Sequence, residues 1–180
     1  MDRLKIATLW LGGCSGCHMS FLDIDEWLID LTAVAELVYS PIMDIKEYPQ
    51  GVDIALVEGA VANEDNLELI RKVRARTRIL VAFGDCAVTG NVTAMRNHFD
   101  SPQPVLDRAY RDASNLHPGI PCEPGIVPPL LPRVLPVHET VPVDHFLPGC
   151  PPPAARIRSI LEQLAGLSGD HQPSRHFKFG

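Results

Sequence analysis

The sequence predicts an α/β fold with a mainly parallel sheet and helices on both of its faces. Apolar runs of strand length alternate along the chain with stretches of helical apolar spacing, and about twenty or more residues separate most successive strands. Such alternation favours right-handed crossovers between parallel strands. The predicted strands are Leu4–Trp10, Val34–Ser40, Val52–Val57, Arg78–Phe83 and Val143–Leu147. The predicted helices run from Met19 to Leu31, from a start at Asn63 or Glu64 toward a basic C-terminal end, after Gly90 within Ala87–Phe99, and from about Pro152 to Leu167.

Length and composition restrict the class of protein. A chain of 180 residues suffices for one domain with a substantial core. The net charge is −6, and Lys and Arg do not cluster, which argues against nucleic-acid binding. No apolar run approaches the roughly 20 residues that span a bilayer. Met1, Asp2 and Arg3 lead directly into a strand without a secretory or twin-arginine leader, so we expect a cytoplasmic protein. Stable disulfides are rare in that compartment.

A proline-rich segment interrupts the alternating pattern. Ten of the 17 prolines lie between residues 101 and 142. Proline at this density excludes long helices and central strands, so we expect an extended surface segment, of the kind that often serves function or a partner. We therefore expect one domain over residues 1–167, with the excursion at 101–142. A polar and basic-aromatic tail follows at 168–180.

Four cysteines share one structural position. Cys14 and Cys17 follow the first strand at the start of a helix, where the dipole favours thiolates. Cys86 follows the fourth strand, and Cys150 follows the last. Because the carboxyl ends of parallel strands meet at one edge of a sheet, we expect the four thiols to lie in one pocket. A glycine lies near each of them in the sequence, and glycine allows the backbone to approach a ligand closely.

Several occupants of this pocket are compatible with the residues. Four thiolates suit a 4Fe-4S cluster or tetrahedral zinc. Structural zinc usually takes two closely spaced pairs in a small domain, whereas this chain has one pair and two distant single cysteines, which favours the cluster. A redox-active Cys14–Cys17 dithiol and inert thiols remain the other interpretations, although a dithiol leaves Cys86 and Cys150 without a role.

Two further residues are candidates with equally good structural explanations, and the fifth cysteine is not a candidate. Glu58 ends the third strand at the same edge, where it could relay protons, orient a partner group or simply cap a turn. His18 could donate to a cluster sulfur or face solvent from the first turn of its helix. Cys122 lies in the proline-rich segment without a paired cysteine, so we take it as a non-ligand. No nucleotide-binding glycine motif is present in its required context.

Taken together, these motifs resemble the small subunit of NiFe-hydrogenases. The resemblance covers about residues 4 to 166 and rests on the order and strand context of four motifs: Cys14-Ser15-Gly16-Cys17, Val57-Glu58-Gly59-Ala60-Val61, Gly84-Asp85-Cys86 and Pro148-Gly149-Cys150-Pro151-Pro152. Related subunits of respiratory complex I carry adjacent cysteines in place of Cys-x-x-Cys. The short chain, without a C-terminal extension rich in cysteine and histidine, is most similar to the soluble cytoplasmic NAD-reducing (bidirectional) type.

The resemblance implies a flavodoxin-like domain that binds one 4Fe-4S cluster through Cys14, Cys17, Cys86 and Cys150. This cluster would lie proximal to a NiFe centre in a separate large subunit, so no catalytic residue for H₂ is expected in this chain. Electrons from H₂ would reach NAD⁺ reversibly through diaphorase subunits that carry FMN and further clusters. Glu58 maps onto a family glutamate near the cluster and the large-subunit interface. The flavodoxin-like shape leaves open whether this subunit binds an FMN of its own.

Two other functions remain open at this point. The electron acceptor lies outside this chain, so a small subunit of a ferredoxin-, sulfur- or F420-linked hydrogenase fits the same motifs. A zinc-stabilised scaffold subunit without a redox role is the alternative of another class.

Overall fold

The computed structural model describes residues 3–113 and 117–167. Its centre is a five-stranded, entirely parallel sheet in the order β2-β1-β3-β5-β7. The strands are β1 (Leu4–Trp10), β2 (Ala35–Tyr39), β3 (Val52–Glu58), β5 (Thr77–Phe83) and β7 (His145–Leu147). Counted along the sheet strands alone, this order is the flavodoxin-like 2-1-3-4-5, which confirms the predicted fold class.

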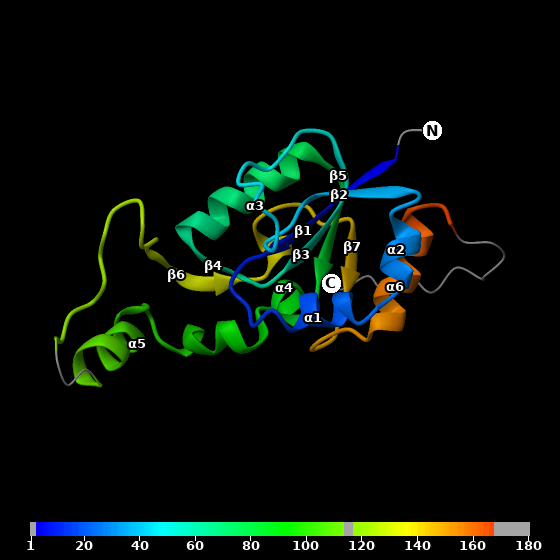
Figure 1. Cartoon of the computed structure of the whole chain (residues 1–180). Helices are drawn as coiled ribbons and strands as arrows, with labels where there is room; N and C mark the ends of the chain where they lie inside the picture. The colour runs from blue at the N-terminus through cyan, green and yellow to red at the C-terminus, as the bar shows by residue number, and fades with distance from the viewer. Residues whose placement is uncertain (1–2, 114–116, 168–180) are drawn as a thin grey trace.

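Helices cover both faces of the sheet (Figure 1). On one face lie α1 (Gly16–Leu22), α2 (Trp27–Leu31) and α6 (Ala154–Leu164), whose apolar side chains pack with Ile54, Leu56 and Val81. The other face is covered by α3 (Glu64–Arg76) and α4 (Asp85–Thr89), which pack on Ala55, Val57 and other residues of the sheet. The central strands are therefore buried on both sides, as their nearly continuous apolar sequences require.

The helix expected from Met19 to Leu31 is divided into α1 and α2. Asp25, between the two helices, has a φ of 54°, in the left-handed region that short polar side chains tolerate best. A right-handed helix cannot continue through that conformation. The apolar periodicity is nevertheless kept, and Phe21, Ile24 and Leu31 belong to the same core cluster.

The helix expected after Gly90 also differs from the prediction. α4 begins earlier, at Asp85, and ends at Thr89. Gly90 has a φ of 84°, and a 3₁₀ helix, η1 (Asn91–His98), follows it. Cys86 therefore lies within the α-helix, whereas we expected the helix to begin after it.

The proline-rich segment has more regular structure than we expected. It contains a short helix, α5 (Gln103–Asp107), a π-helical turn, η2 (Arg108–Asp112), a strand, β6 (Leu130–Leu135), and a 3₁₀ turn, η3 (Val137–Glu139). β6 pairs antiparallel with β4 (Val61–Asn63) in a separate two-stranded sheet. Figure 1 shows β6 and α5 extending away from the main sheet. The tail predicted at 168–180 lies outside the described residues.

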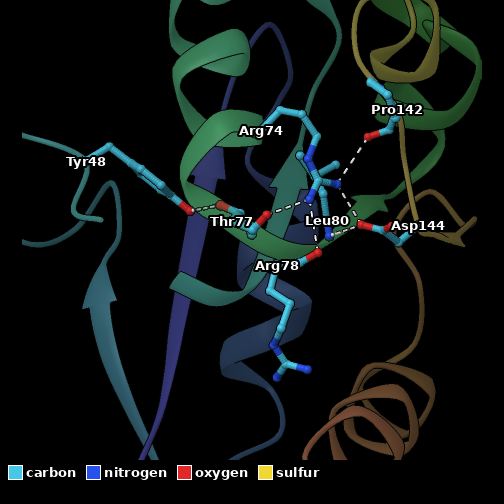
Figure 2. Close-up of polar contacts among 7 residues, drawn as sticks. All are labelled: Tyr48, Arg74, Thr77, Arg78, Leu80, Pro142 and Asp144. Carbon is cyan, nitrogen blue, oxygen red and sulfur yellow. Dashed lines mark hydrogen bonds and ion pairs between the residues drawn. The ribbon is translucent and has the colours of Figure 1, made fainter. Parts of the chain in front are cut away.

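Polar contacts around Arg74 fasten the end of the sheet that lies opposite the cysteines (Figure 2). The Arg74 guanidinium donates to Asp144 Oδ2 at 2.6 Å and to the carbonyl oxygens of Thr77, Arg78 and Pro142 at 2.5, 3.0 and 3.3 Å. Asp144 also accepts from the Leu80 N–H at 2.7 Å. α3, β5 and the segment before β7 are thereby joined in one network.

Candidate functional site

The structure brings Cys14, Cys17, Cys86 and Cys150 together at the carboxyl edge of the sheet. All four are free thiols, with Cys17 and Cys86 buried and Cys14 and Cys150 exposed. Burial raises the pKa of Cys17 above its usual range, and negative charge on Glu58 and on the other three cysteines raises that pKa further. Burial likewise raises the pKa of Cys86, as does negative charge on Cys14 and Cys150. The four sulfurs are therefore close enough to interact electrostatically. Cys122 is exposed in the proline-rich segment and takes no part in these interactions.

Gly84 allows the turn after β5 to pass directly beside a cysteine sulfur. Its φ is 85° and its ψ is 162°, a combination that is essentially restricted to glycine. A Cβ atom at this position would lie 2.2 Å from Cys17 Sγ, so no other residue fits without displacing the thiol. The close approach brings the Cys17 turn and the Cys86 turn into direct contact.

Hydrogen bonds join the turns at this edge of the sheet in two pairs. Gly12 and Ala60 exchange N–H···O bonds of 2.9 and 2.8 Å, which tie the turn after β1 to the turn after β3. The Asp85 N–H donates to the Gly149 carbonyl at 2.9 Å, and Asp85 Oδ1 accepts from the Gly149 N–H at 2.7 Å. The cysteine turns are therefore braced against one another by the chain itself.

Two polar side chains from η1 reach the thiols. Asn91 Nδ2 donates to Cys150 Sγ at 3.4 Å. The Thr93 and Asn91 side chains oppose the burial-driven rise in the pKa of Cys86, because both favour a negative charge on its sulfur. The Thr93 hydroxyl also donates to the Gly12 carbonyl at 3.1 Å. We did not predict a role for Asn91 or Thr93 from the sequence, in which only their position shortly after Cys86 and Gly90 indicates that they lie near the site.

Glu58 and His18 form a buried pair beside Cys17. Glu58, only 2% exposed, accepts from the Cys17 N–H at 3.4 Å and from the His18 N–H at 3.0 Å. Its Oε2 also contacts His18 Nδ1. His18 is 6% exposed, so the solvent-facing interpretation is wrong. The helix turns this side chain inward because the Glu58 carboxylate meets both its ring and its backbone. The remaining ring nitrogen, Nε2, is buried and has no hydrogen-bond partner among the described residues.

The donor set fits a cluster of several irons. Four thiols lie at the carboxyl edge of the sheet, two of them in a dry environment, and glycine at position 84 lets the backbone approach Cys17 Sγ. In an iron–sulfur cluster the thiolates bind separate irons, so they surround the cluster rather than a single point. Over residues 3–113 and 117–167, no three His, Cys, Asp or Glu side chains are grouped as the ligands of one metal ion. The same residues include no helix long and apolar enough to cross a membrane.

Comparison with known proteins identifies one family. The model of the NADH ubiquinone oxidoreductase 20 kDa subunit family matches residues 14–164, a range that includes all four clustered cysteines. The delta subunit of the NAD-reducing hydrogenase HoxS of Cupriavidus necator is 41% identical over 90% of this chain and 78% of its own length. A vhu subunit of the F420-non-reducing hydrogenase of Methanocaldococcus jannaschii is 37% identical over 93% of this chain. The match spans only 57% of that archaeal protein.

Solved structures agree with the fold. A chain of an NAD⁺-reducing [NiFe]-hydrogenase in its H₂-reduced state matches with a TM-score of 0.88 and 40% identity, over 99% of this chain and all of that one. A chain of the [NiFeSe]-hydrogenase of Dm. baculatum matches with a TM-score of 0.56 over 93% of this chain and 64% of that one. Its 18% identity supports the fold alone.

Proposed function

This chain belongs to the NADH ubiquinone oxidoreductase 20 kDa subunit family, as a relative of hydrogenase small subunits, and on that premise we propose that it is the electron-transfer subunit of a cytoplasmic NiFe-hydrogenase coupled to NAD⁺ reduction. The observation that carries the proposal is the convergence of four free thiols at the carboxyl edge of the sheet. In the proposed role, Cys14, Cys17, Cys86 and Cys150 bind one 4Fe-4S cluster. When bound, such a cluster supplies reversible one-electron transfer.

The protein around the cysteines has two tasks in this function. It excludes water at Cys17 and Cys86, which lowers the local dielectric, and it directs the Asn91 amide toward the sulfur of Cys150. Hydrogen bonds, burial and charge near the sulfurs are the means by which a protein sets the potential of a cluster. The turn contacts at Gly12, Asp85 and Gly149 hold in place the turns that carry the proposed ligands.

Glu58 is the candidate for a proton-relaying or interface residue. It is the carboxylate in hydrogen-bond contact with the Cys17 turn, and it already shares a contact with an imidazole nitrogen of His18. A carboxylate and an imidazole in contact can exchange a proton without a large rearrangement. We assign no H₂-activating residue to this chain, because Cys122 is the one cysteine left beyond the cluster ligands. The H₂ site would lie in a large NiFe subunit.

Metal analysis of the purified full chain tests the cofactor. We expect iron and sulfide in equal amounts, about four each per chain, and a visible absorption that dithionite bleaches. Cys86→Ser should abolish both, whereas Cys122→Ser serves as a matched control and should leave both unchanged. A colourless protein with stoichiometric zinc would establish the scaffold alternative instead. Equal iron loss in the two variants would show that the ligand set is wrong.

Co-purification from the native source tests the electron acceptor. A large NiFe subunit together with diaphorase subunits that carry FMN, further clusters and NADH-oxidising activity is the expected result. The second candidate, another acceptor, is favoured by the similarity to subunits of F420-non-reducing hydrogenases. Partners without NADH-oxidising activity would support that candidate. Flavin analysis of the chain after separation from its partners decides whether an FMN belongs to this subunit.

A further inference from the structure

A buried serine on α1 bonds to the turn that carries Cys150. The Ser20 side chain is only 6% exposed, and its hydroxyl donates to the Pro152 carbonyl oxygen at 2.6 Å. The two residues are 132 positions apart in the sequence. Ser20 lies three residues after Cys17, so both side chains occupy one face of α1, and both are buried. The hydrogen bond therefore links the helix that carries Cys17 to the turn that carries Cys150.

The Pro152 carbonyl needs a donor from a distant part of the chain. Pro151, Pro152 and Pro153 have no N–H group, so none of the three can supply a hydrogen bond. Pro152 is itself buried, and a buried carbonyl without a donor costs free energy comparable to a lost hydrogen bond. Ser20 meets this requirement. Removal of its hydroxyl therefore favours a displacement of Pro152 toward water.

Pro152 lies directly against the residue that precedes Cys150. A Cβ atom on Gly149 would lie 2.6 Å from Pro152 Cα and 2.7 Å from Pro152 N, so the turn closes tightly around Cys150. Gly149 also forms the two hydrogen bonds with Asp85. Asp85 therefore holds this turn before the cysteine, and Ser20 holds it after the cysteine.

Apolar packing gives this turn little further support. Cys150, Pro151 and Pro153 are exposed, and Pro148 and Gly149 are only partly buried. A segment with few buried apolar contacts opens easily unless polar contacts hold it. The position of the Cys150 sulfur therefore depends mainly on the anchors at Gly149 and Pro152.

We propose that Ser20 is a positioning residue for the cluster, whose hydroxyl fixes the Cys150 turn relative to Cys17. The inference rests on the proposed function, because the spacing of these two thiols matters only if they bind one group. Outer hydrogen bonds that orient the ligands of a metal group commonly strengthen its binding. Ser20 acts in this way through the Pro152 carbonyl and is not itself a ligand.

Exchange of backbone amide hydrogens tests the anchor on the full chain, co-purified with its partner subunits. Four of the six residues from 148 to 153 are proline, so this segment carries only two amide hydrogens, those of Gly149 and Cys150. Deuterium uptake by peptides that cover the segment therefore isolates the turn. In Ser20→Ala we expect these two amides to exchange about tenfold faster than in the parent, because a buried carbonyl has lost its donor.

Two variants serve as controls. Ser20→Thr keeps a hydroxyl on the same Cβ atom and should return the exchange to nearly the parent rate. Tyr48→Phe removes another buried hydroxyl contact, the 2.7 Å hydrogen bond to Thr77 Oγ1. β5 begins at Thr77, whereas Cys86 follows the end of that strand. Tyr48→Phe should therefore lower the urea midpoint without changing the exchange of the Gly149 and Cys150 amides.

The cluster supplies a second readout in the same proteins. A chelator should remove iron from Ser20→Ala about tenfold faster than from the parent, because a ligand that loses its outer support binds its metal less tightly. The electron paramagnetic resonance signal of the reduced cluster should broaden in Ser20→Ala, because the Cys150 ligand then takes a range of positions. Tyr48→Phe should keep the parent rate of iron release and the parent signal.

Several results would overturn the inference. Parent-like exchange of the two amides in Ser20→Ala would show that Ser20 does not hold the turn. An equal increase in Tyr48→Phe, or no recovery in Ser20→Thr, would show that the hydroxyl itself is not responsible. Iron release from Ser20→Ala at the parent rate would show that the anchor does not serve the cluster. Amide exchange is measured in the same way whatever the thiols bind, so a failure of the anchor is distinguishable from a failure of the proposed cluster.

Discussion

Asp85 and Gly149 hold two cysteine turns together through a reciprocal pair of hydrogen bonds. The Asp85 N–H donates to the Gly149 carbonyl at 2.9 Å, and Asp85 Oδ1 accepts from the Gly149 N–H at 2.7 Å. Asp85 immediately precedes Cys86, and Gly149 immediately precedes Cys150. The separation of two proposed ligands from distant parts of the chain is thus fixed by one side chain and one peptide.

Replacing Asp85 therefore tests whether this brace matters for the site. Asp85→Ala removes a charged acceptor, and we expect it to lower the free energy of unfolding by about 1.5–3 kcal/mol and to reduce iron content. Asp85→Asn keeps a carbonyl oxygen at the same position and should recover most of both. Urea unfolding and iron analysis of the full chain measure these effects. An Asp85→Ala variant with the iron content and stability of the parent would rule out the brace.

The space beside Cys17 gives a second prediction. Gly84→Ala places a Cβ atom 2.2 Å from Cys17 Sγ and forces alanine into a backbone conformation with a φ of 85°. We expect little or no iron to be retained. Gly51 also has a positive φ, 68°, but its Cβ would meet no atom within 4 Å. Gly51→Ala should therefore cost about 1–2 kcal/mol of stability while leaving iron content intact. Equal iron retention in the two variants would contradict the close approach.

Asn91 offers a graded test of the potential of the proposed cluster. Its Nδ2 donates to Cys150 Sγ at 3.4 Å, and such a donor stabilises the more negative, reduced state. Asn91→Ala removes about 0.5–1.5 kcal/mol of stabilisation, so the midpoint potential should fall by about 20–60 mV for one electron. Asn91→Asp replaces the donor with a negative charge and should lower the potential further. Redox titration followed by electron paramagnetic resonance measures the series. A potential that is the same in all three proteins would show that the contact does not influence the cluster.

The sequence predicted the sheet because its signals are local. Each strand is a short apolar run closed by glycine or proline, and the crossovers between them leave few arrangements open. The convergence of Cys14, Cys17, Cys86 and Cys150 followed from strand ends alone. The order and direction of the strands are enough to predict that these cysteines meet, and no side-chain contact needs to be known.

Contacts between distant segments were not predictable in this way. The left-handed conformation of Asp25, which divides the first helix, is one that many aspartates do not adopt. The inward orientation of His18 depends on Glu58, 40 residues away. The pairing of β6 with β4 could not be read from a segment dominated by proline, because the partner strand has only three residues.

The network in Figure 2 predicts how stability depends on pH. Burial alone would raise the pKa of Asp144, but the Leu80 N–H and Arg74 outweigh it, so the pKa is lowered. A lowered pKa in the folded state contributes stability above the unfolded pKa of about 3.9, and this contribution is lost as the pH falls through the folded value. Asp144→Asn should therefore be less stable than the parent at pH 7 and approach it in acid. Urea unfolding across this range measures the difference.

The same variant separates structural from functional effects. Asp144 bonds to Leu80, in the middle of β5 and six residues before Cys86, so Asp144→Asn should leave iron content and midpoint potential unchanged at neutral pH. A constant stability difference between pH 7 and pH 3 would show that the charge of Asp144 is not what stabilises the fold.

Glu58 and His18 should be strongly coupled in stability. The Glu58 carboxylate is met by three donors, namely the N–H groups of Cys17 and His18 and the His18 ring. Glu58→Gln places an amide NH₂ among these donors, and we expect the free energy of unfolding to fall by about 2–3 kcal/mol. Glu68→Gln, at an exposed position on α3, is the matched control and should change stability little. A double-mutant cycle with His18→Phe should give a coupling energy of at least about 1 kcal/mol. Additive effects of the two substitutions would mean that the pair does not act as a unit.

Isotope exchange then distinguishes a proton relay from a purely structural carboxylate. In the complex with its partner subunits, a relay through Glu58 requires Glu58→Gln to slow the exchange of H₂ with deuterated water by about a hundredfold or more. Glu58→Asp keeps an ionisable group on a shorter side chain and should recover part of the rate. The comparison is made only between preparations with equal iron content, so that loss of cofactor does not imitate loss of proton transfer. If exchange stays normal in Glu58→Gln while stability falls, Glu58 acts solely by positioning the turn that carries Cys17.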